Sequence, residues 1–149
     1  LPYTTPDLIS TAYLNDINPE AANLLKLNME QFQRNRKIDG TYVIHCMDAR
    51  NLADARPEMQ GCADVLLVNL PHDGIAHLTH LHPLLSHDIS LICGWTIQEK
   101  QANILQQLQT IFEPSGRTMI EHRIEEVKGF SSAKAMFRYE LVLSKENRR

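Results

Sequence analysis

The sequence lacks an apolar run long enough to cross a membrane, and it has no signal-peptide pattern. It also lacks a large excess of charge of either sign, because its 149 residues carry a formal net charge of −3. Composition therefore does not impose the strongly basic surface of a nucleic-acid clamp. We expect a cytoplasmic protein without membrane association.

Cysteine is scarce, with Cys46, Cys62 and Cys93 as the three examples. Three cysteines cannot all pair with one another, and two of these lie in apolar runs typical of buried strands. We predict reduced thiols in the core of a protein from a reducing compartment. The length and the 43% of hydrophobic residues fit one domain, residues 1–149.

Basic residues gather late in the chain, where they could contact a phosphate backbone or form a solvated hairpin and a charged tail. We take the second interpretation. They are Arg117, Arg123, Lys128, Lys134, Arg138, Lys145, Arg148 and Arg149.

Hydrophobic periodicity predicts strands that alternate with helices. Asn18 and Pro19 suit the cap and first position of a helix that ends near residues 34–37, before the turn pair Asp39-Gly40. A polar connector with some helical character follows at 48–56, stopped by Pro57. The predicted strands are 11–16, 41–47, 63–70, 89–95, 117–127 and 134–144, and the other helices are 75–86 and 97–112.

Two details of this pattern matter later. The run 63–70 is almost continuously apolar, which is typical of a strand covered on both faces. Thr96 is a candidate cap for the helix 97–112. Alternating strands and helices imply a Rossmann-like α/β fold with a mainly parallel, doubly wound sheet, and the last two strands form an antiparallel hairpin.

Ligands of open α/β sheets bind beyond the carboxyl ends of the strands. Asp16, Asp48 and Asn69 follow three consecutive predicted strands, so we expect them to converge on one rim. Asp16 could accept hydrogen bonds from ribose hydroxyls or form a turn. Asp48 could accept from an adenine amino group or cap the polar connector. Asn69 could read a base edge, with Pro71 stiffening its loop, or form an ordinary turn.

Histidines are dense between residues 72 and 87. His77 and His80 share a helix face and could ligate a metal, but no cysteine is nearby, so we predict no metal site and a half-exposed helix that titrates. Trp95 is expected to pack at a strand end, with stacking on a base as the alternative.

From residue 12 to residue 144 the chain resembles the archaeal and eukaryotic tRNA methyltransferase family that modifies guanine 37 at ring nitrogen 1. The sister branch transfers an aminocarboxypropyl group in wybutosine synthesis. The similar segments are Asp16-Ile17-Asn18-Pro19-Glu20-Ala21, Asp48-Ala49-Arg50, Asn69-Leu70-Pro71, the helix ending in Pro83-Leu84-Leu85, and Val127-Lys128-Gly129-Phe130.

This resemblance implies a class I methyltransferase domain that uses S-adenosylmethionine, with tRNA as the partner in tRNA processing. Asp16 would hold the donor's ribose and Asp48 would sit beside its adenine. Asn69, Leu70 and Pro71 would shape the pocket for the target base near the sulfonium. The residues expected to bind the donor are Asp16, Asn18, Asp48, Ala49 and Asn69. No general base is assigned.

The family's first strand and its glycine-rich loop should precede residue 11, but residues 1–10 contain no glycine. The domain therefore looks like a partial one that lacks this strand. The strand could belong to a missing N-terminal segment or to a second chain, or the protein could be a degenerate relative.

Whether this chain alone is an enzyme is left open. One alternative is a non-catalytic, methyltransferase-like interaction module. Another is a methyltransferase for a small molecule or a protein, since the fold does not dictate the substrate.

Overall fold

The computed structural model describes residues 9–36 and 40–145. The chain divides into two compact units, a first unit at Leu1–Leu52 and a second unit at Ala53–Arg149. Residues 1–8, Asp39, Arg148 and Arg149, about which the sequence raised expectations, lie outside the described residues. In the described part, no helix has the length and apolar character needed to span a bilayer.

The first unit is a β-α-β element. Strand β1 (Thr11–Asn15) and strand β2 (Thr41–His45) pair in parallel, and α1 (Pro19–Arg36) connects them. The Asn18 side chain accepts a hydrogen bond from the Glu20 N–H at 2.9 Å, which satisfies a free donor of the first helical turn. The predicted start of this helix at Asn18-Pro19 is confirmed.

The polar connector after β2 has the helical character expected of it. A short 3-10 helix (Ala49–Asn51) leads into α2 (Leu52–Ala55), and a second 3-10 helix begins at Pro57. Pro57 lacks the N–H that a continuing helix would use, which explains the break.

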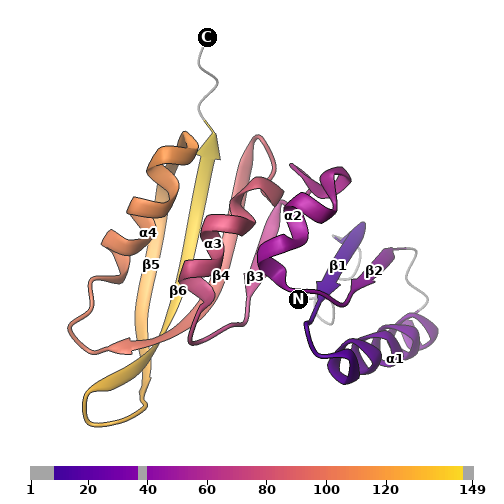
Figure 1. The fold of residues 1–149 in the computed structure, drawn as a ribbon, viewed down its shortest axis with the longest axis horizontal. Helices are drawn as coiled ribbons and strands as arrows, with labels where there is room; N and C mark the ends of the chain where they lie inside the picture. The colour runs from indigo at the N-terminus through magenta and orange to yellow at the C-terminus, as the bar shows by residue number, and fades with distance from the viewer. Residues whose placement is uncertain (1–8, 37–39, 146–149) are drawn as a thin grey trace. The chain divides into compact units, whose positions relative to one another are not determined.

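The second unit contains a four-stranded sheet in the order β3-β4-β6-β5 (Figure 1). The β3 and β4 strands are parallel, whereas β6 is antiparallel to both β4 and β5. The predicted final hairpin is therefore confirmed. The strands are β3 (Val65–Val68), β4 (Ile89–Glu99), β5 (Arg117–Gly129) and β6 (Lys134–Lys145).

Two helices, α3 (Gly74–Leu81) and α4 (Ile104–Phe112), lie on the same face of this sheet (Figure 1). Their apolar sides meet the alternate residues of β4 and β6 that point toward them, and together these side chains form the core of the unit. The fully or almost fully buried members are Leu78, Leu85, Ile92, Leu108, Phe112, Tyr139, Leu141 and Leu143.

The assignment of Thr96 as a helix cap is wrong. Strand β4 continues through Thr96 to Glu99, because β6 pairs with it from Ile89 to Glu99. Helix α4 begins only at Ile104, and the Asn103 side chain caps it by accepting from the Gln106 N–H at 3.0 Å. Pairing with β6, which follows much later in the chain, outweighs the helical periodicity of residues 97–103.

The prediction that the run 63–70 is covered on both faces is also wrong for the described residues. Strand β3 has only four residues and pairs only with β4 there. Val65 and Leu67 are 45% and 55% exposed, whereas Val68, on the side of α3, is buried. Val65 and Leu67 point to the sheet face opposite to that of Val68, and it is this face that is open.

Two smaller expectations need correction. The helix predicted at 75–86 ends at Leu81, and a 3-10 helix (His82–Leu84) containing Pro83 replaces its last part. The three cysteines are free, but none is a core thiol, because Cys46 is exposed and Cys62 and Cys93 are half-buried.

Candidate functional site

The acidic residues Asp16 and Asp48 follow the two parallel strands of the first unit at their carboxyl ends. Asn15 and His45 are the last paired residues, and the Asp16 N–H extends the ladder to the His45 carbonyl at 3.3 Å. Parallel strands end at the same edge of a sheet, so both carboxylates belong to this one edge.

Asp16 forms a local turn with part of its hydrogen-bonding capacity. One carboxylate oxygen accepts from the Asn18 N–H at 2.8 Å, which is the turn that the sequence analysis left as an alternative. An ionised carboxylate has about four acceptor positions, so this bond does not exhaust the group. The turn and the predicted contact with ribose are therefore compatible.

Asp48 is more strongly engaged than Asp16. Its side chain accepts from the Arg50 N–H at 2.9 Å and forms an ion pair with the Arg50 guanidinium at 2.6 Å. It is thus the cap of the short helix that follows, the other alternative for this residue. Ala49, at the start of that helix, has an N–H that no bond within the helix can use.

Asn15, which the sequence analysis did not single out, holds this edge together. Its amide donates to the Met47 carbonyl at 3.0 Å and accepts from the Met47 N–H at 3.3 Å. These two bonds tie the end of β1 to the residue just before Asp48. Since Asn15 directly precedes Asp16, an asparagine at the end of a predicted parallel strand was the signal available in the sequence.

In the second unit, the loop after β3 carries Asn69, Leu70 and Pro71. The Pro71 carbonyl accepts from the Ile97 N–H at 2.7 Å, and the Gly74 N–H donates to the Leu70 carbonyl at 2.6 Å. The loop is therefore fixed to β4 and to the start of α3. Asn69 is exposed, and its carboxamide has no hydrogen-bond partner within the described ranges.

Two exposed rings lie near this loop. His72 and Phe130, from the β5–β6 turn, make an edge-to-face contact with their ring centroids 6.3 Å apart. Phe130 is 55% exposed, so most of its ring is open to solvent. Trp95 lies inside β4 and not at a strand end, because β4 is longer than predicted.

The histidines show no metal geometry. Among residues 9–36 and 40–145, no group of three or more His, Cys, Asp or Glu side chains could hold a metal ion. His77 Nδ1 lies 2.8 Å from the Asp73 carbonyl within its own helix.

Each predicted site residue thus lies beyond a strand end of its own unit. The structure brings Asp16 and Asp48 to one edge in the first unit, and it puts Asn69 at the carboxyl end of β3 in the second. The convergence of all three on one rim stays a prediction.

The chain has a Rossmann-like α/β fold, and this fold is similar to that of solved S-adenosylmethionine-dependent methyltransferases. Among the solved structures with this fold is TYW2 from M. jannaschii in complex with AdoMet (S-adenosylmethionine). It is 16% identical over 92% of this chain and 59% of its own, with a TM-score of 0.77.

Two Trm5 structures are similar as well. Trm5b from Pyrococcus abyssi is 17% identical over 91% of this chain and 38% of its own, with a TM-score of 0.67. The aTrm5 in complex with tRNALeu is 20% identical over 89% of this chain and 35% of its own, with a TM-score of 0.58. No protein-family model and no curated protein sequence matches the chain.

This chain spans about three fifths or less of the length of these structures. At such low identity the similarity establishes the fold, which agrees with the fold expected from the resemblance in the sequence.

Proposed function

We propose that this chain is part of a transferase that moves a carbon group from S-adenosylmethionine to a base in tRNA, a guanine of the anticodon loop. The observation that carries the proposal is the shared fold with TYW2 bound to AdoMet over 92% of the chain. The Trm5 structure with tRNALeu supports tRNA as the substrate. The transferred group is methyl or, as in wybutosine synthesis, aminocarboxypropyl.

The donor would bind at the edge formed by β1 and β2. Asp16 retains acceptor capacity for the ribose hydroxyls, while Asn18 orients the turn that presents it. The Ala49 N–H would donate to the adenine ring and Asp48 would accept from its amino group. In this role Asn15 is a positioning residue, because it anchors Met47 beside Asp48.

The target base would lie against the loop after β3. The unpartnered Asn69 carboxamide offers a donor and an acceptor for a base edge, and Pro71 is tied to β4. Phe130 offers an exposed ring on which a base can stack. S-adenosylmethionine supplies the electrophilic carbon when it is bound, so the chain's own contribution is to position the base.

The free edge of β3 is part of the same proposal. A further strand would pair with the edge of β3 through main-chain hydrogen bonds, and the segment attached to it would cover the face that carries Val65 and Leu67, because parallel sheets are normally buried on both faces. A segment joined to this chain and a second chain are its two possible sources, and chromatographic mass measurement distinguishes them.

Calorimetry with S-adenosylhomocysteine tests the proposal. We expect binding heat and a loss of affinity of about tenfold or more for Asp16→Asn, since a hydrogen bond to a charged group contributes roughly 1.5–3 kcal/mol. Glu20→Gln, a matched change in the first turn of α1, should bind normally. No heat from this chain, and none from a version extended upstream of Leu1, would remove the transferase proposal.

The exposed apolar edge of β3 favours a second candidate, a non-catalytic module that binds another protein through this sheet. This candidate predicts a folded chain that gives no heat with S-adenosylhomocysteine in either form. Mass spectrometry of tRNA treated with the extended chain separates the two, and the added mass identifies the group transferred.

A further inference from the structure

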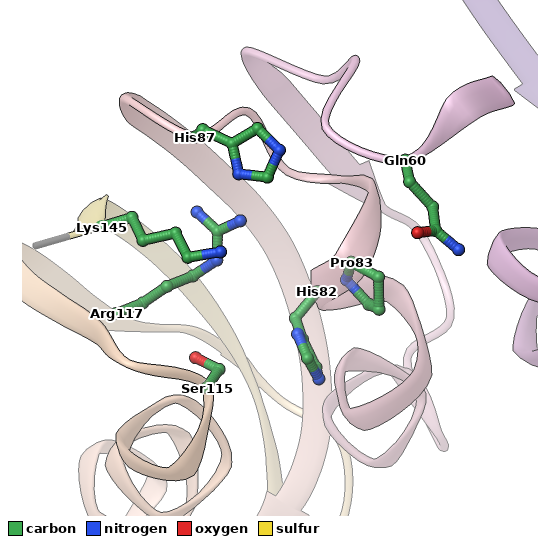
Figure 2. Close-up of a pocket in the computed structure, with 7 residues that line it drawn as sticks. All are labelled: Gln60, His82, Pro83, His87, Ser115, Arg117 and Lys145. Carbon is green, nitrogen blue, oxygen red and sulfur yellow. The ribbon is translucent and has the colours of Figure 1, made fainter. Parts of the chain in front are cut away.

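A small cavity lies in the second unit at the end of the sheet opposite to Asn69. Arg117, the first residue of β5, and Lys145, the last residue of β6, are register partners there, and His87 precedes β4. The cavity has a volume of about 230 Å³. Its polar lining comes from Gln60, His82, His87, Ser115, Arg117 and Lys145 (Figure 2).

Arg117 is a buried cation without a carboxylate partner in the described part of the chain. The residue is only 7% exposed. Its guanidinium donates to the carbonyls of Ser86 at 2.8 Å and Leu85 at 2.9 Å. The ion pairs found in residues 9–36 and 40–145 involve other residues. A buried charge is costly unless an opposite charge accompanies it.

The groups around Arg117 add positive charge. Lys145 also makes no ion pair with a described residue, and no Asp or Glu is among the described residues that line the cavity. Burial lowers the pKa of His82, and the nearby charges of Arg117, Lys145 and His80 lower it further. Asp88, in the adjacent turn, uses its main-chain carbonyl to accept from the Lys145 N–H at 3.4 Å.

The turn at Gly61 lies against the segments that carry the two histidines. Gly61 has a left-handed backbone (φ 73°), and its N–H donates to the Pro83 carbonyl at 3.0 Å, beside His82. The His87 ring packs against Gly61 so closely that an added Cβ would lie 3.0 Å from Nε2. These contacts restrain part of the cavity wall before a ligand binds, which limits the entropy lost on binding.

We propose that this cavity binds a phosphate group, presented either by the backbone of an RNA or by a small phosphoester. Arg117 uses one hydrogen of each terminal nitrogen for the carbonyls, so three of its five donors remain for a ligand. Lys145, His82 and His87 come from different segments around the cavity and add further donors (Figure 2). This arrangement fits a tetrahedral anion with several acceptor oxygens and up to two charges.

The first test is a titration of the full chain with inorganic phosphate, followed by nuclear magnetic resonance of the histidine rings. A bound anion offsets the positive neighbours of His82, so the pKa of His82 should rise toward its ordinary value on saturation. The signals of His72 and His77, which do not line the cavity, serve as internal controls.

Lys145→Gln and His87→Gln remove exposed donors without disturbing the structural bonds of Arg117. Each should weaken phosphate binding about tenfold, the effect of one lost charge-assisted hydrogen bond. Lys134→Gln is the matched control, because it makes the same charge change at the opposite end of β6. Equal weakening by Lys134→Gln would mean a general charge effect and would overturn the proposal.

A short single-stranded RNA then distinguishes the two sources. If the RNA backbone is the occupant, RNA shifts the His82 signal and Lys145→Gln suppresses this shift. If inorganic phosphate and small phosphoesters shift the His82 signal and RNA does not, the occupant is a small molecule. Histidine signals that stay unchanged with saturating phosphate and with RNA would refute the site, whatever the outcome of the S-adenosylhomocysteine experiment.

Discussion

At the residue scale, Tyr139 combines complete burial with a hydroxyl that has no hydrogen-bond partner in the described part of the chain. Desolvation is the main reason that its pKa lies well above the ordinary value of 10.0, and Cys93 adds to the effect. A buried polar group without a partner reduces stability. We expect Tyr139→Phe to leave the free energy of unfolding unchanged or to raise it by about 1 kcal/mol, as measured in urea.

Tyr139 also predicts a dependence of stability on pH. Because its pKa is raised in the folded state, the unfolded state loses this proton first, and stability falls as the pH rises above about 10. Below that pH the protonated Tyr139 makes its full contribution to the free energy of unfolding. In urea titrations between pH 8 and pH 11, the free energy of unfolding of Tyr139→Phe should fall less steeply with pH than that of the unchanged protein. Tyr13→Phe, a change at a 44% exposed tyrosine, should show the same fall as the unchanged protein.

Gly94 is required by the same side chain. A Cβ at this position would overlap the hydroxyl and ring of Tyr139, its register partner on β6. We expect Gly94→Ala to lower the free energy of unfolding by about 1–3 kcal/mol, the usual effect of overpacking a core. Gly129→Ala is the control, since nothing lies within 4 Å of its added Cβ. Equal stability of the two variants would contradict this account.

At the scale of elements, β4 and α4 illustrate where local signals were insufficient. The sequence analysis named Thr96 as the cap, but Thr96 is 1% exposed within β4 and Asn103 caps α4. Periodicity predicts that a helix exists. Its first residue depends on how far β6 extends along β4, which local spacing does not contain.

Asn103→Ala tests this corrected boundary. The variant loses the bond to the Gln106 N–H, and we expect it to lower the free energy of unfolding by about 1 kcal/mol. Gln109→Ala, on the exposed side of α4, should have almost no effect. Thermal unfolding followed by circular dichroism measures both, and the reverse order of stabilities would show that the cap is elsewhere.

The two edge strands of the second unit differ in the charge of their side chains. The outer strand β5 carries charged residues along its length, including Glu121, Arg123 and Lys128, and such residues discourage pairing with another sheet. The opposite edge, β3, consists of Val65, Leu66, Leu67 and Val68 and has no charge at all.

At the scale of the whole molecule, this asymmetry predicts self-association through β3. We expect Leu67→Lys to reduce the apparent mass at high protein concentration, because it puts a charge on an edge side chain that is 55% exposed. Val127→Lys, on the already charged β5, should leave the mass unchanged. Light scattering coupled to gel filtration measures both, and an effect of Val127→Lys alone would contradict the role of β3.

Several features could be predicted from the sequence because they depend on neighbouring residues. Asn18 and Pro19 start α1 through bonds within one turn, and the short connection after Gly129 requires an antiparallel hairpin. The positions of Asp16, Asp48 and Asn69 beyond strand ends follow from the same local pattern. Asp16 and Asp48 meet their side-chain partners two positions further along the chain.

Only the tertiary structure decided the length of β4, the exposure of β3 and the burial of Arg117. Arg117 appeared in the sequence as one of many basic residues on a solvated hairpin, yet it donates to carbonyls more than 30 residues away. Burial and charge at such a site are sums over distant segments. The spacing of neighbouring residues therefore does not predict this burial or charge. It does predict a helix cap or a turn, because all the residues involved lie within a few positions of one another.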